Sequence, residues 1–174
     1  IHTQQSETSN NFKNFVGEKM TPLIENKKYS EAYTILVSNS KYKSDLNYFF
    51  YKAELLFFLE KYDDASAIIN AELSTALDEN PEYLDLKLEC LSAVNGNYDA
   101  INLLVEKIDI YKNNKRDYQK TIDRYYQKYL ENFISVPYQE RKVLLISNDS
   151  NYLKTANFVV IKQDKLPKIS FPLN

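Results

Sequence analysis

Apolar residues recur at intervals of three and four along most of the chain, from Phe12 to about Ile134. This spacing places them on one face of a helix with 3.6 residues per turn, so it predicts amphipathic α-helices. Short polar connectors separate the stripes, and connectors of this length make successive helices pack antiparallel. The pattern predicts a mainly α fold of antiparallel helical hairpins, with helices over residues 12–24, 32–36, 49–59, 65–73, 84–94, 100–108 and 122–134.

Two prolines refine the expected helix boundaries. Pro81 stands where a helix is expected to begin, a position at which its missing N–H is not needed. Pro22 falls inside the first stripe, where it removes a backbone donor and clashes with the preceding turn. We therefore expect the first helix to be kinked or broken near Pro22.

The connectors repeat along the chain. The segment NKKYSEA at residues 26–32 recurs as LEKYDDA at residues 59–65, so that the tyrosines and the alanines are each 33 residues apart. A weaker copy, GNYDA, covers residues 96–100. A fixed period of this size is typical of stacked helical hairpins.

These residues resemble the tetratricopeptide repeat (TPR) family over about residues 12–112. The first copy departs from the family pattern, with Met20 in the position of a small residue and Pro22 within the helix. The resemblance implies a short TPR-like solenoid whose last helix, over residues 116–135, caps the final hairpin; the alternative is an irregular helical bundle with coincidental turns. The second copy matches best, with its large, small and turn residues at Phe49, Ala53, Leu56, Tyr62 and Ala65.

Both ends of the chain lack the helical spacing of apolar residues that marks the helical domain expected over residues 12–135. Residues 1–11 are polar and predict a flexible leader. Two β-branched runs at residues 142–147 and 157–162 flank a turn-rich stretch, which predicts two short strands forming a β-hairpin. An isolated hairpin is marginally stable, so the extended tail over residues 136–174 is expected to dock on the helical domain or on a partner.

Composition and charge narrow the function classes. Only two glycines occur in 174 residues, which argues against a β-sandwich, a dinucleotide-binding fold and a P-loop NTPase. The net charge of −2 provides no global basic field, so nucleic acid is not an expected partner. Acids predominate over residues 45–89 and bases over residues 105–128, which is typical of partner surfaces or of solvated faces.

The sequence offers little for catalysis. Its one histidine is His2, in the polar leader, and its one cysteine, Cys90, lies on an apolar stripe where an inert buried thiol is expected. Glu79, Glu82, Asp85 and Glu89 share one helix face, which could hold a cation or be solvated. We expect no catalytic residue, no metal site and no cofactor. The basic stretch over residues 112–128 either contacts phosphates or lipid headgroups or forms a solvated helix.

In the TPR family, defined positions of the first helix of each hairpin line a concave groove. Carried over to the second and third copies, these positions combine aromatic with acidic side chains, which suits an extended or helical peptide bearing basic and apolar side chains. The alternative is that the three phenylalanines belong to the core, covered by the first hairpin or by the C-terminal tail. The expected partner-binding groove comprises Asn47, Phe50, Glu54, Phe57, Phe58, Glu82, Asp85 and Glu89.

The sequence thus predicts a non-enzymatic scaffold that binds a protein or peptide partner. The alternative function is an accessory domain of a larger assembly whose C-terminal strands pair with a partner, and a small enzyme ranks last. The composition favours a bacterial origin, and the polar leader favours a periplasmic or envelope-tethered location over the cytoplasm. A membrane is expected as a partner only through an N-terminal anchor preceding Ile1, and the oligomeric state stays open.

Overall fold

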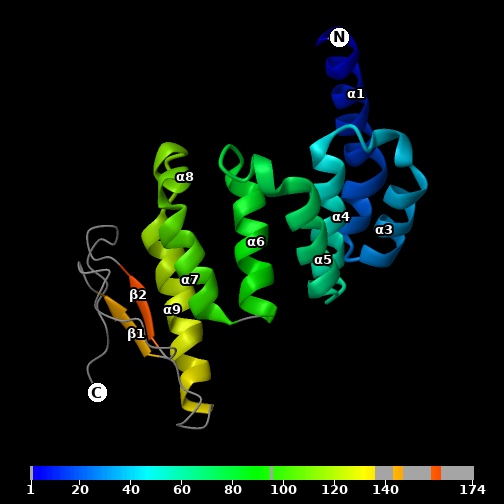
Figure 1. Ribbon diagram of the computed structural model, residues 1–174. Helices are drawn as coiled ribbons and strands as arrows, with labels where there is room; N and C mark the ends of the chain where they lie inside the picture. The colour runs from blue at the N-terminus through cyan, green and yellow to red at the C-terminus, as the bar shows by residue number, and fades with distance from the viewer. Residues whose placement is uncertain (1, 95, 136–142, 147–157, 162–174) are drawn as a thin grey trace. The chain divides into compact units, whose positions relative to one another are not determined.

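The computed structural model describes residues 2–94, 96–135, 143–146 and 158–161, and over these residues the chain is mainly helical. The chain divides into two compact units, unit 1 over residues 1–77 and unit 2 over residues 78–174. Figure 1 labels the helices and strands of both units. Each unit is described by itself.

Unit 1 consists of helices whose order follows the predicted stripes. Within it, α4 packs against both α3 and α5, so that α4 is the central helix of the unit. The elements of unit 1 are α1 (His2–Phe15), the π-helix η1 (Val16–Met20), α2 (Thr21–Glu25), α3 (Tyr29–Ser38), the 3₁₀ turn η2 (Ser40–Tyr42), α4 (Leu46–Phe58), α5 (Tyr62–Ile68), the π-helix η3 (Ile69–Leu73) and the 3₁₀ turn η4 (Ser74–Ala76).

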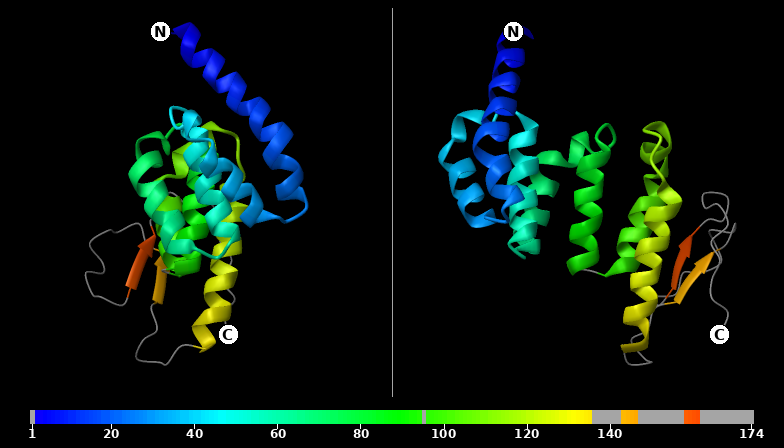
Figure 2. Two further views of the ribbon diagram at one scale, coloured as in Figure 1. Left: turned by 90° about the vertical axis from the view of Figure 1, so that its right-hand side faces the viewer. Right: turned by 180° about the vertical axis from the view of Figure 1, so that it is seen from behind.

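The first helix begins earlier than expected. Residues 2–11, for which we expected a flexible leader, lie in α1. The N-terminal turns of α1 extend past the other helices of unit 1, as Figures 1 and 2 show, and Glu7, Ser9 and Asn10 are exposed there. Phe12, the first apolar residue of the stripe, is buried in the core and anchors the C-terminal part of α1. A helix held at one end can propagate through polar residues, which composition alone does not reveal.

The interruption expected at Pro22 is confirmed. The backbone widens into η1 over residues 16–20, and α2 then begins at Thr21 with Pro22 in its first turn, where no intrahelical donor is required. The Thr21 N–H and the Thr21 hydroxyl both donate to the Val16 carbonyl, the hydroxyl at 3.2 Å. The proline is therefore accommodated by a π turn rather than by a loop.

The two best repeat copies form the same backbone corner. Lys27 and Glu60 both adopt left-handed conformations, with φ of 56° and 61°. The next amide donates back over the corner in each copy, from Lys28 to Leu23 O at 2.8 Å and from Lys61 to Leu56 O at 2.9 Å. This is the Schellman arrangement that ends a helix and lets a second helix start at once. The 33-residue repeat therefore corresponds to a repeated local structure.

The core of unit 1 lies between α1–η1, α3 and α4. Tyr48 and Leu55, two turns apart on α4, are fully buried in it. Ala32 on α3 is fully buried as well, and its small side chain lets the helices approach closely. Fully burying one aliphatic side chain contributes about 1.5–3 kcal/mol, so the burial of this cluster stabilises the unit. Its buried members are Phe12, Val16, Met20, Ala32, Leu36, Tyr42, Tyr48 and Leu55.

Unit 2 is built around α7, which packs against both α6 and α9. Pro81 opens α6, as expected from the sequence. The third corner uses Gly96 with φ of 105°, a conformation that side-chain-bearing residues rarely adopt. The described elements are α6 (Pro81–Val94), α7 (Asn97–Glu106), α8 (Ile108–Asn113), α9 (Tyr118–Ser135) and the strands β1 (Val143–Ile146) and β2 (Phe158–Ile161).

The two strands differ from the expected β-hairpin because they pair in parallel, Val143 opposite Phe158 and Ile146 opposite Ile161. A hairpin joins antiparallel strands through a short turn, whereas parallel strands need a connection that returns to the starting edge. Residues 147–157 provide a connection longer than a tight turn. β2 contacts α7, so this strand lies against the helices of unit 2. The rest of the tail expected over residues 136–174 lies outside the described residues.

Candidate functional site

Five of the expected groove residues share one side of α4. Asn47, Phe50, Glu54, Phe57 and Phe58 follow helical spacing along one side of α4, while Tyr48 and Leu55 of the same helix face the core. Asn47 is exposed, Phe50, Glu54 and Phe57 are half-buried, and Phe58 is 39% exposed. We call these five residues the α4 outer face. None of its three phenylalanines is fully buried, in contrast to the alternative that placed them in the core.

The corner tyrosines hold two rings of this face in place. Phe58 stacks on Tyr29 with ring centroids 4.7 Å apart, and Phe57 contacts Tyr62 at 5.3 Å. Phe57 and Phe58 also meet edge to face at 6.0 Å. Tyr29 and Tyr62 are the tyrosines that mark the sequence repeat. They therefore connect the repeated corners to the aromatic part of the α4 outer face, and such ring pairs add about 0.5–1.5 kcal/mol beyond the buried area.

Glu54 lies in the middle of the α4 outer face. Phe50 precedes it by one helical turn and Phe57 follows it by about one turn. Burial raises the pKa of the Glu54 carboxyl above its ordinary value, because desolvation disfavours the charged form. Burial also raises the pKa of Tyr51, and the nearby Glu54 charge adds to that effect. Within the described part of the chain, no hydrogen bond or ion pair reaches the Glu54 carboxylate.

The acids of the third copy are engaged by unit 2 itself. Asp85 on α6 accepts hydrogen bonds from the Tyr111 hydroxyl and the Arg116 guanidinium, and Arg116 also pairs with Glu82 at 2.8 Å. Burial raises the pKa of the Tyr111 hydroxyl, and its hydrogen bond to Asp85 raises it further. We expected Glu82 and Asp85 to line the partner groove, but they bind Tyr111 of α8 and Arg116 of the connection between α8 and α9.

Glu89 shows the same arrangement one turn along α6. Its Oε1 accepts from the Tyr125 hydroxyl at 2.7 Å and from Arg124 Nη2 at 2.6 Å. Tyr125 is fully buried, and both burial and the bond to Glu89 raise its pKa. We call the contacts of Glu82, Asp85 and Glu89 with these partners the α6–α9 clasp. Tyr125 lies on the helix that we expected to cap the last hairpin, and its buried hydroxyl donates to a carboxylate.

The basic stretch over residues 112–128 is partly used in the same way. Arg116 and Arg124 bind α6 acids, while Lys112 lies over the Tyr118 ring at 5.5 Å and Lys128 over the Tyr125 ring at 5.7 Å. The charge asymmetry between α6 and α9 therefore reflects contacts within unit 2. Both arginines of this stretch thus pair with acids of α6.

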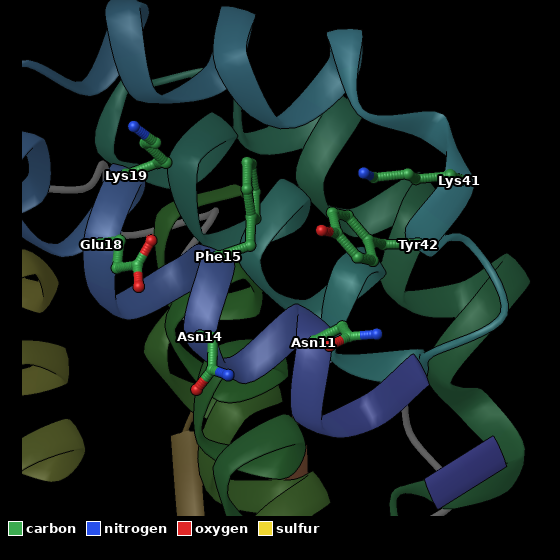
Figure 3. A pocket seen from close by; sticks show the side chains of 7 residues that line it. All are labelled: Asn11, Asn14, Phe15, Glu18, Lys19, Lys41 and Tyr42. Carbon is green, nitrogen blue, oxygen red and sulfur yellow. The ribbon is translucent and has the colours of Figure 1, made fainter. Parts of the chain in front are cut away.

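A cavity of about 460 Å³ lies beside η1 in unit 1. Phe15 and Tyr42 contribute rings with centroids 5.1 Å apart, and Figure 3 shows these rings between Lys19 and Lys41. The remaining lining side chains, Asn11, Asn14 and Glu18, are polar. No sequence motif marked this cavity, because its walls come from α1–η1 and from the separate turn η2. It offers hydrogen-bonding groups and ring faces but no paired nucleophile and base.

The remaining expectations concern chemistry and membranes. Cys90 is buried on α6, as expected. Over the described ranges, acidic, cysteine and histidine side chains form no group placed to hold a metal ion. None of the described helices combines the length and apolar character needed to cross a bilayer.

The chain was compared with family models, curated proteins and solved structures. No family model matches the chain, and no curated protein or solved structure matches it either.

Proposed function

We propose that this protein is a non-enzymatic scaffold that binds a partner polypeptide through the α4 outer face. The observation that carries the proposal is a solvent-accessible row of aromatic side chains with a carboxylate at its centre, held by the corner tyrosines. Exposed aromatic side chains are enriched at protein interfaces, where their large area is buried at low entropic cost. The partner segment carries apolar and basic side chains.

The repeated corners support a TPR-like arrangement for this scaffold. The Schellman turns at Lys27 and Glu60 and the buried alanines Ala32 and Ala65 recur at the same period. In a TPR-like arrangement α4 is the first helix of the second hairpin, and the first helices line the binding surface. The acids of the third hairpin form the contacts of the α6–α9 clasp. The proposed binding surface therefore comprises the α4 outer face alone.

A second function rests on the strands. β1 and β2 form a two-stranded sheet, and a sheet this small leaves edges on which a further strand can pair. In this alternative the chain is an accessory domain of a larger assembly, and residues 143–146 or 158–161 add to a partner's β-structure. The α4 outer face is then not required for the interaction.

Phe57→Glu tests the main proposal. The charge placed on the α4 outer face should abolish recovery of the partner in a quantitative pull-down from native lysate. Val37→Glu is the matched control, because Val37 on α3 is as exposed as Phe58, at 40%, and receives the same charge. Circular dichroism at the assay temperature verifies that both variants are folded. Recovery of the same proteins by both variants would rule out the α4 outer face, and loss with a β1 or β2 variant instead would favour the accessory domain.

A further inference from the structure

Glu54 is half-buried on α4, with Phe50 one turn before it and Phe57 about one turn after it, and its carboxylate has no counter-charge among the residues that the structure describes. A carboxylate withdrawn from water loses hydration energy that only a hydrogen bond or an opposite charge restores. Neighbouring rings do not restore it, because the face of an aromatic ring is the negative end of its quadrupole. Phe50, Phe57 and the half-buried Tyr51 therefore provide an environment that favours a cation beside Glu54.

Unit 2 contains a partly buried acid that does receive a hydrogen bond and an opposite charge. Glu89 is also a helix acid with a partly buried side chain, 28% exposed, and it has an aromatic neighbour in Tyr125. There the Arg124 guanidinium completes the group, pairing with Glu89 at 2.6 Å while lying over the Tyr125 ring at 4.8 Å. An acid, an aromatic ring and a cation form one unit in the clasp. At Glu54 the acid and the rings are present, and no cation of the described residues approaches.

We infer that Glu54 is the anchor for a lysine or arginine side chain of the partner polypeptide, with Phe50 and Phe57 flanking the aliphatic stem of that side chain. This inference rests on the proposed function of the α4 outer face and specifies the chemistry of its partner. Lysine and arginine both combine an apolar stem with a charged head, so they match a carboxylate framed by rings. Phe58, exposed one turn beyond Glu54, contacts an apolar residue next to that cation.

A peptide titration tests the anchor. The probe is a blocked synthetic peptide of alternating leucine and lysine, followed by ¹H–¹⁵N NMR on the full chain. A second peptide carries acetyl-lysine at every lysine, which removes the charge and keeps the stem. Glu54→Gln keeps the shape of the side chain and removes its charge. Glu72→Gln is the matched control, because Glu72 is an exposed acid on η3 in the same unit.

We expect the lysine peptide to shift amide signals of α4 around Glu54 and to bind Glu54→Gln about tenfold more weakly, the effect of losing one charge-assisted contact. Glu72→Gln should bind within about twofold of the wild type, since an exposed charge contributes little. The acetyl-lysine peptide should bind the wild type and Glu54→Gln equally weakly.

Equal binding of the lysine and acetyl-lysine peptides to the wild type would overturn the anchor, and so would unchanged affinity of Glu54→Gln. Absence of any shift in α4 with either peptide would overturn it as well. These failures are distinguishable from failure of the proposed function: an interface without this anchor would still lose its partner with Phe57→Glu and keep it with Val37→Glu.

Discussion

At the residue scale, the two acids that best define the molecule are Glu54 and Glu89, which have similar surroundings and different partners. Glu89 receives Arg124 and Tyr125 from the same unit, whereas Glu54 receives neither a hydrogen bond nor an ion pair from the described residues. Under the proposed function, an acid paired with a cation serves stability at Glu89 and recognition at Glu54. An acid left without a partner in the folded chain lowers stability, and binding restores what folding leaves unsatisfied.

The stability difference between Glu54→Gln and the wild type should depend on pH, because only the ionised Glu54 carboxylate is penalised by burial. Burial raises the pKa of Glu54 in the folded state, so the folded chain binds a proton at this carboxylate more tightly than the unfolded chain does. Stability is lost as the pH rises from about 4, the ordinary value, through the raised pKa. We expect Glu54→Gln to have a higher Tm than the wild type at pH 7 and no advantage at about pH 3.5.

Thermal melts at both pH values measure this difference. Glu72→Gln serves again as the control and should leave the Tm close to the wild-type value at both, since surface substitutions change stability by about 0.5 kcal/mol or less. A Tm advantage of Glu54→Gln that is the same at both pH values would show that the ionised carboxylate is not the source of the cost.

At the element scale, the corners at Lys27 and Glu60 are positions where sequence and backbone preference conflict. Both residues carry side chains in the left-handed region, at φ of 56° and 61°, where glycine is the usual choice. Glu60→Gly should raise the free energy of unfolding by roughly 0.5–1 kcal/mol, because the strain removed exceeds the added flexibility of the unfolded chain. Urea unfolding followed by circular dichroism measures it.

The control for the corner is a glycine within a helix. Ala67 is exposed in α5, and Ala67→Gly should lower the free energy of unfolding by about 0.5–1 kcal/mol. Destabilisation by Glu60→Gly of the same size as by Ala67→Gly would contradict the left-handed corner. Lys27→Gly should behave like Glu60→Gly, because the two corners share their hydrogen bonds.

At the scale of the whole molecule, the sequence predicted those features that depend on neighbouring residues, namely the helices and the corners between them. The repeat at Tyr29 and Tyr62 and the proline at residue 81 concern contacts within a few residues, and helices and corners occur where these signals predict them. The helical conformation of residues 2–11 was missed because its anchor, Phe12, follows rather than precedes the polar segment.

Tertiary contacts account for the rest of the difference. Helical spacing put Glu82, Asp85 and Glu89 on one face, but it could not show that Arg116 and Arg124, about 30 residues away, would occupy that face. The charge asymmetry showed that an acidic stretch is followed by a basic one. It did not show whether the acids pair with those bases of the same chain or with a separate protein. Asn47, Phe50, Glu54, Phe57 and Phe58 all lie within α4, and the helical period alone places them along one side of it.

The division of roles between α4 and the α6–α9 clasp leads to a prediction for the molecule as a whole. Glu89→Ala removes the carboxylate that accepts from Arg124 and from the hydroxyl of the fully buried Tyr125, so the proton of this hydroxyl loses its acceptor. An unsatisfied buried polar group costs about 1–3 kcal/mol, so the free energy of unfolding should fall by that amount. Partner recovery at a temperature well below the Tm should stay at the wild-type level, because Glu89 is engaged inside unit 2.

Phe57→Glu should lose partner binding at a temperature at which it is still folded, although its unfolding free energy falls because the ring contacts with Tyr62 and Phe58 are lost, at about 0.5–1.5 kcal/mol each. Measuring urea unfolding and pull-down recovery on the same two variants separates the two roles. If Glu89→Ala lost the partner while remaining folded and Phe57→Glu retained it, the interaction surface would be the acidic face of α6. The clasp would then be a contact that the partner displaces, and the same carboxylates would serve folding and binding in turn.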